Sequence, residues 1–140
     1  MRKLIGFFFL SIQLNQANQW SIEKVKETYN LVTRKSSKVY SYYIPTTGSV
    51  PKIIKNDNLG KSVLRVVYYA GSAGTSEIVK TYRATLIDKT TMKLIKDLPF
   101  KYELDKNSKL KLVQPQWTIK NDELSVIDNE SGVSFKYQLK

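Results

Sequence analysis

A chain of 140 residues is long enough for one domain with a hydrophobic core, and its 41% hydrophobic and 25% charged residues are typical of folded soluble proteins. The sequence contains no cysteine and no histidine, which excludes disulfides, thiolate or imidazole metal sites, cysteine nucleophiles and Ser-His-Asp triads within this chain. The net charge of +11 favours acidic partners, namely an acidic protein, anionic lipid, acidic polysaccharide or nucleic acid. Only four of the 23 basic residues are arginines, the residue that phosphate recognition favours. A composition bias of the genome therefore explains the lysine surplus as well as a binding surface does.

The first seventeen residues are typical of a signal peptide. Met1-Arg2-Lys3 is a short positive region, and the apolar stretch from Leu4 to Leu14 is too short to cross a bilayer. Ala17 is the best residue for cleavage, although Asn15 is larger than signal peptidases prefer. We expect an exported chain, periplasmic or secreted, whose residues 18–140 form a single β-rich domain without a transmembrane span. The alternative is a buried N-terminal strand of a cytoplasmic protein.

A helix is predicted at the start of the mature chain, from Ser21 to about Thr33. Its apolar residues recur at spacings of three and four: Ile22, Val25, Tyr29 and Val32. Ser21 can cap the first turn, and Arg34 follows the end, where the helix dipole favours a cation.

From Lys38 onward the hydrophobic period is two, which is typical of strands. Phe100, Tyr102 and Leu104 alternate with charged residues, and the C-terminal residues alternate in the same way. Turn residues separate these runs, whereas the segment Pro45 to Lys61 suggests a long loop or a short edge strand. We therefore predict a mainly β fold, α+β at the margin: an antiparallel β-barrel or sandwich of about seven to nine strands with one N-terminal helix.

The segment Ala70-Gly71-Ser72-Ala73-Gly74 differs from the hydrolase nucleophile elbow G-x-S-x-G at its first residue. An elbow needs a following helix and a histidine, and a phosphate-binding loop needs a Gly-Lys-Ser/Thr ending, so neither fits. A dyad of Ser72 with Lys80 is chemically conceivable, but nothing in the spacing demands it. We interpret the segment as a hairpin loop between strands Val63–Tyr69 and Ile78–Ile87.

A hairpin tip of small and hydroxyl-bearing residues next to two tyrosines can enter the cleft of another protein. The candidate partner-binding residues are Tyr68, Tyr69, Ser72, Thr75, Ser76 and Glu77.

A second candidate surface combines basic residues with tyrosines, and its basic residues are Arg34, Lys35 and Lys38. Basic side chains interleaved with aromatic side chains can bind single-stranded nucleic acid. Export argues against nucleic acid and favours a partner-binding or wall-facing surface. The twelve acidic residues are scattered, and most of them, including Asp97 and Asp128, are expected in turns or on solvent faces.

The sequence therefore predicts no catalytic residue, no metal site and no cofactor. Our first hypothesis is an exported binding protein that inhibits or neutralises a partner protein, as an inhibitor or immunity protein does against an enzyme that attacks the cell envelope. One alternative is a basic surface-binding module. Another is a β-barrel carrier of a small ligand, with an interior lined by aromatic residues that a filled core would use equally well: Tyr82, Tyr102, Trp117, Phe135 and Tyr137. The last alternative is an enzyme that uses a serine or a carboxylate pair.

Overall fold

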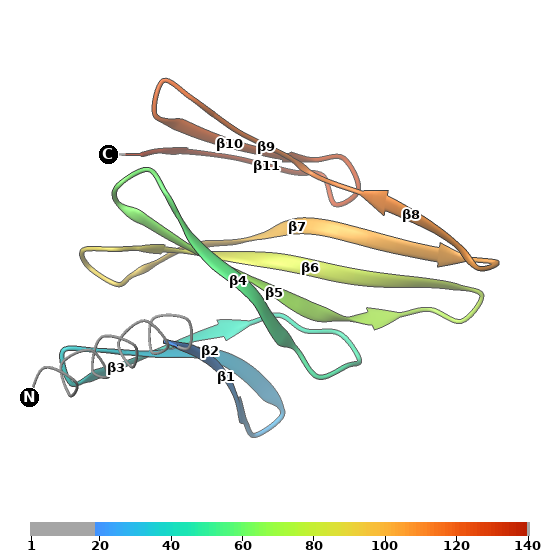
Figure 1. Ribbon diagram of the computed structural model, residues 1–140, viewed down its shortest axis with the longest axis horizontal. Helices are drawn as coiled ribbons and strands as arrows, with labels where there is room; N and C mark the ends of the chain where they lie inside the picture. Colours follow the sequence, from blue (N-terminus) through green and yellow to red (C-terminus); the bar gives the residue numbers. More distant parts are fainter. Residues whose placement is uncertain (1–18, 140) are drawn as a thin grey trace, which may run out of the picture. The chain divides into compact units, whose positions relative to one another are not determined.

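A computed structural model describes residues 19–139, which form eleven strands and, within that range, no helix (Figure 1). In chain order the strands are β1 (Trp20–Val25), β2 (Thr28–Lys35), β3 (Lys38–Ile44), β4 (Lys52–Leu59), β5 (Val63–Ala73), β6 (Glu77–Asp88), β7 (Leu94–Lys106), β8 (Lys109–Val113), β9 (Gln116–Lys120), β10 (Glu123–Asp128) and β11 (Val133–Gln138). They form three sheets, β1-β2-β3, β4-β5-β6-β7-β8 and β9-β10-β11, in which neighbouring strands follow one another in the chain. The chain divides into two compact units, one ending at Tyr43 and the other beginning at Ile44, and the second unit holds the latter two sheets.

The mainly β prediction is confirmed, but the predicted N-terminal helix is wrong. Residues 20–35 form the hairpin of β1 and β2, in which Ile22 lies opposite Leu31 and Val25 lies opposite Thr28. The chain reverses at Lys26, whose φ is 59°. β-branched and aromatic residues lose side-chain freedom in a helix and pack well on a pleated surface. The apolar spacing of three and four therefore came from two short strands on either side of a turn.

The strand count and the barrel alternative also need correction. The five-stranded sheet has β4 and β8 as its two edges, so it does not close into a barrel. The described part of the chain contains eleven strands rather than seven to nine. Part of the difference in strand number comes from the segment Pro45 to Lys61. It was expected as a long loop or a short edge strand, but it contains β4, a strand of eight residues.

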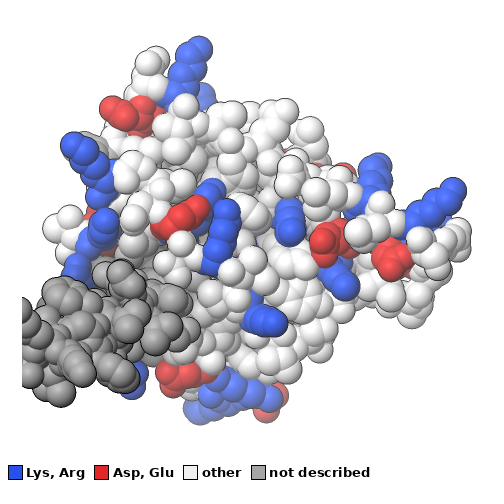
Figure 2. All heavy atoms as spheres, viewed as in Figure 1, with Lys and Arg blue, Asp and Glu red and all other residues white. Residues whose placement is uncertain are grey.

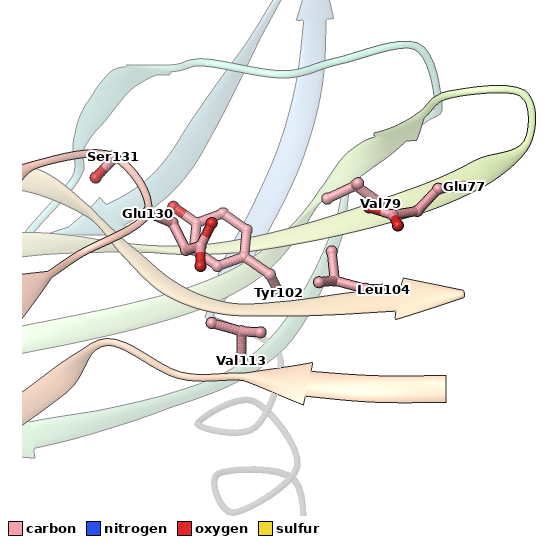
Figure 3. A pocket seen from close by; sticks show the side chains of 7 residues that line it. All are labelled: Glu77, Val79, Tyr102, Leu104, Val113, Glu130 and Ser131. Atoms are coloured by element: carbon pink, nitrogen blue, oxygen red, sulfur yellow. The ribbon is translucent and has the colours of Figure 1, made fainter. Parts of the chain in front are cut away.

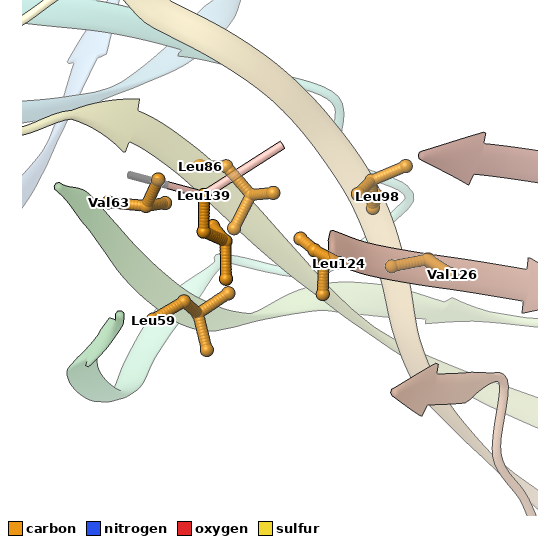
Figure 4. Close-up of a cluster of buried hydrophobic side chains, with 7 residues drawn as sticks. All are labelled: Leu59, Val63, Leu86, Leu98, Leu124, Val126 and Leu139. Carbon is orange, nitrogen blue, oxygen red and sulfur yellow. The ribbon is translucent and has the colours of Figure 1, made fainter. Parts of the chain in front are cut away.

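The core of the second unit lies between its two sheets (Figure 4). Seven buried residues form it, four from the five-stranded sheet and its β4–β5 hairpin and three from β10 and the chain end: Leu59, Val63, Leu86, Leu98, Leu124, Val126 and Leu139. Trp117, Phe135 and Tyr137 pack against this cluster. Burial of this apolar surface is the main force that holds the β9–β11 sheet against the larger one.

Two-residue turns set the register of three hairpins. Both turn residues have positive φ in each case: Ser36-Ser37 (52° and 66°), Asn107-Ser108 (53° and 61°) and Asn121-Asp122 (53° and 60°). Two consecutive residues with positive φ are characteristic of type I′ turns, whose twist matches that of the flanking strands. Asparagine and aspartate tolerate this conformation better than serine does, so the serine pair carries the largest backbone strain of the three.

A partly buried polar cluster joins β5, β6 and β7. The Asp97 carboxylate accepts hydrogen bonds from Arg83 Nε (2.5 Å), the Tyr68 hydroxyl (2.6 Å) and the Thr85 hydroxyl (2.9 Å). Burial and the neighbouring Asp97 carboxylate raise the pKa of Tyr68 far above its usual value. Burial alone would lower the pKa of Arg83, but Asp97, together with Tyr68 and Tyr102, outweighs burial and raises this pKa. The expectation that Asp97 lies in a turn or on a solvent face is wrong, because it is the shared acceptor of this cluster.

Candidate functional site

The hairpin of β5 and β6 ends in an exposed tip, and the hairpin interpretation is confirmed. Strand β5 extends to Ala73 and β6 begins at Glu77, so the connecting loop is Gly74-Thr75-Ser76 rather than residues 70–74. Residues 73–76 are all exposed. In Figure 1 the tip lies at the same end of the five-stranded sheet as the β7–β8 turn, and Glu77 lies opposite Lys106.

Glycines allow a second segment of the chain to support this hairpin. The Thr47 N–H donates a hydrogen bond to the Ala70 carbonyl (2.8 Å), and Thr47 pairs with Gly71 in a parallel bridge. A Cβ atom on Gly71, whose φ is 124°, would lie 1.7 Å from the Thr47 carbonyl oxygen. A Cβ atom on Gly48 would lie 2.6 Å from the Ser72 carbonyl oxygen. The glycines therefore permit backbone contact that fixes the base of the tip.

Ser72, the residue that resembled a nucleophile, lies in this supporting contact. Its Oγ is 3.2 Å from Ser49 Oγ, and this hydroxyl pair is partly buried. The register places Ser72 directly opposite Lys80, which in turn lies opposite Glu103 on β7. Ser72 and Lys80, the two residues of the considered catalytic dyad, are thus neighbours. The Ser72 hydroxyl, however, forms its hydrogen bond with Ser49.

A pocket of about 260 Å³ lies beside the tip (Figure 3). Its lining comes from β6, β7, β8 and the β10–β11 turn: Glu77, Val79, Tyr102, Leu104, Val113, Glu130 and Ser131. Val79 lies opposite Leu104, and Tyr102 lies opposite Val113. Because side chains two residues apart share one face of a strand, Val79, Leu104, Tyr102 and Val113 form a continuous apolar surface, and Glu77 and Glu130 add two carboxylates to the lining.

A hydrogen-bonded carboxylate fixes one wall of this pocket. The buried Asp128 side chain accepts hydrogen bonds from the Tyr102 hydroxyl (2.7 Å) and the Ser131 hydroxyl (2.6 Å). Burial and the hydrogen bond to Asp128 raise the pKa of Tyr102 to about 12. Burial alone would raise the pKa of Asp128, but the hydroxyl groups of Ser131 and Tyr102 and two backbone N–H groups lower it. Tyr102 therefore stays a neutral donor, and the β10–β11 turn is held against β7.

The predicted partner-binding residues differ in exposure. Thr75 and Ser76 are exposed at the tip, and Ser72 and Glu77 are half-buried at its base. Tyr68 is fully buried with its hydroxyl on Asp97, so its side chain is not part of the exposed tip. Tyr69 is half-buried, and its ring lies 5.4 Å from the ring of Tyr82.

The sequence reasoning missed the contribution of Glu130 and Ser131 to this site. The alternation around Tyr102 identified β7, but no pattern in the sequence brings the β10–β11 turn to it. The long-range hydrogen bond from Tyr102 to Asp128 links this turn to β7.

The predicted basic surface lies in the first unit. Arg34, Lys35 and Lys38 are all exposed and flank the Ser36-Ser37 turn between β2 and β3. One tyrosine of this predicted surface, Tyr42, is buried, with its ring centroid 6.1 Å from that of Trp20. Figure 2 shows lysine and arginine side chains spread over the visible face with acidic side chains among them, rather than gathered in one patch.

The aromatic residues proposed as a carrier lining have protein partners. Trp117, Phe135 and Tyr137 pack against the core cluster, and the Tyr82 hydroxyl donates to Glu103 (2.8 Å). A surface hollow of about 430 Å³ borders Phe135 and Tyr137, together with Asp88, Thr91, Lys93, Leu94 and Ile95.

Within residues 19–139, no three acidic side chains group closely enough to hold a metal ion, and no helix has the length and hydropathy to span a membrane. The predicted signal peptide lies outside the described residues. Comparison of the chain with known proteins finds no matching family model, curated protein or solved structure.

Proposed function

We propose that this chain is a small exported protein that binds and inhibits or neutralises a partner protein, with the tip of the β5–β6 hairpin as its contact. The observation that carries the proposal is the construction of the tip. Its exposed residues 73–76 are small, and the backbone contacts of Thr47 and Gly48 with Gly71 and Ser72 support its base. A preorganised loop loses little conformational freedom on binding, and this favours affinity.

The pocket beside the tip supports the same function. Apolar walls with carboxylates at the rim suit an aliphatic or aromatic side chain of the partner that ends in a hydrogen-bond donor. Glu77 belongs both to the base of the tip and to the pocket. The two features therefore form one contact region, and the surplus of lysines steers the chain toward partners with acidic surfaces.

The experiment uses the chain from Asn18 as bait against an envelope and secreted fraction at moderate salt, with mass spectrometry of the retained proteins. We expect one stoichiometric partner, and we expect Thr75→Arg to abolish its capture because a long side chain cannot enter the same cleft. Ser134→Arg is the matched control, since it adds the same charge at an exposed position on β11. Equal capture by wild type and Thr75→Arg excludes the tip as the contact.

A further inference from the structure

The strand β8 forms an open edge of the five-stranded sheet. It pairs with β7 from Tyr102 opposite Val113 to Lys106 opposite Lys109, and no described strand pairs with its other side. In an antiparallel ladder, every second residue of such a strand directs its N–H and C=O toward the open edge. An extended segment of another protein can pair with these groups and add a strand to the sheet.

The two faces of β8 differ in chemistry. Lys109 and Lys111 point to the same face as Lys106 and border a hollow of about 410 Å³, whose other lining residues are Glu77, Leu104 and Asn107. Leu110 and Leu112 point to the opposite face, and their side chains are 69% and 52% exposed. Large exposed aliphatic side chains on an open strand mark an interaction surface.

We propose that β8 binds an extended segment of a partner protein in which acidic and apolar residues alternate. The acidic side chains of the added strand would lie beside Lys109 and Lys111, and its apolar side chains would lie beside Leu110 and Leu112, because side chains opposite each other on paired strands interact directly. This proposal does not depend on the β5–β6 tip.

The charge pattern disfavours a second copy of this chain as the occupant. Pairing β8 with another β8 so that the leucines share a face also places lysine against lysine, and like charges opposite each other are destabilising. A segment of alternating acidic and apolar residues places acidic side chains beside the lysines on one face and apolar side chains beside the leucines on the other.

The test uses a synthetic peptide of alternating glutamate and valine residues with blocked ends, and a matched peptide of alternating lysine and valine. We expect the glutamate peptide to bind the chain saturably and the lysine peptide not to bind. Amide hydrogen exchange should slow in β8 and not in β4, the opposite edge. The double variant Lys109→Glu and Lys111→Glu should weaken binding on the order of tenfold or more, because it replaces two attractions by two repulsions.

The double variant Lys120→Glu and Lys136→Glu is the control, since both lysines are exposed on the other sheet of the same unit and the net charge changes equally. The proposal is overturned by a glutamate peptide that does not bind, by equal binding of both peptides, by protection of β4 instead of β8, or by equal loss of affinity in the two double variants. Concentration-dependent self-association through β8, measured by sedimentation, would assign the edge to a second copy and would also overturn it.

Discussion

Replacing Asp97 with asparagine should destabilise the second unit strongly, because this carboxylate serves three donors on its two oxygens. Oδ1 accepts from Arg83, and Oδ2 accepts from the hydroxyls of Tyr68 and Thr85. Asparagine has a single acceptor oxygen, so its NH₂ group must face either the guanidinium or the two hydroxyls. In both orientations the Arg83 charge loses its counterion.

The expected loss in the free energy of unfolding depends on how far solvent reaches the Arg83–Asp97 ion pair. The side chains of Arg83 and Asp97 are 24% and 14% exposed. Loss of one partner of a fully buried ion pair costs about 3–5 kcal/mol, and partial access of water to Arg83 lowers the expected cost to about 2–4 kcal/mol. Urea denaturation followed by tryptophan fluorescence should show this loss as a lower midpoint with an unchanged slope.

The matched control is Asp57→Asn, which removes the carboxylate of the Arg65–Asp57 pair. Asp57 is 35% exposed, and its loss should cost about 1 kcal/mol or less because solvent screens the pair. If Asp97→Asn lowers the free energy of unfolding by no more than Asp57→Asn does, the Arg83–Asp97 pair does not stabilise the protein in this way. A double-mutant cycle of Asp97→Asn with Arg83→Met should give a coupling energy of at least about 1 kcal/mol, since the variants remove the same interaction.

Three further changes test other parts of the structure. Ser37→Gly should stabilise the protein by roughly 0.5–1 kcal/mol in urea denaturation, because φ at this position is 66°, whereas Ser125→Gly in β10 should destabilise it. Gly71→Ala should prevent folding or disorder the hairpin, because its Cβ would lie 1.7 Å from the Thr47 carbonyl oxygen, and a wild-type thermal transition would contradict that contact. Asp128 has a lowered pKa in the folded state, so its stabilising contribution is present above the unfolded value, close to 4, and is lost as the pH falls through the folded value. Asp128→Asn should therefore be less stable than wild type at neutral pH and should approach it in acid, and a constant difference across pH would argue against the sign of this shift.

Local patterns predicted the strands wherever one face is apolar and the ends carry turn residues. Phe100, Tyr102 and Leu104 marked β7, and the asparagine-containing turns marked the hairpin after it. The same reasoning failed for residues 21–33, where apolar spacing in two short strands resembled a helix.

The interactions between distant strands were beyond such reasoning. Asp97 and Asp128 look like ordinary turn or surface carboxylates in the sequence, because Arg83 and Tyr68 for one, and Tyr102 for the other, lie 14 to 29 residues away. The contact of Thr47 with Gly71 likewise depends on a long-range return of the chain. The hairpin could thus be predicted from the sequence, but not the pocket beside it or the groups that hold the two in place.

Site-specific photo-crosslinking tests directly whether the β5–β6 tip contacts a partner protein. A photoreactive phenylalanine derivative replaces Ser76 at the tip of the β5–β6 hairpin in one variant and Ser134 on β11 in another, and each is irradiated in an envelope and secreted fraction. We expect a single crosslinked partner from position 76 and none from position 134. No adduct from position 76, or the same set of adducts from both positions, would contradict it.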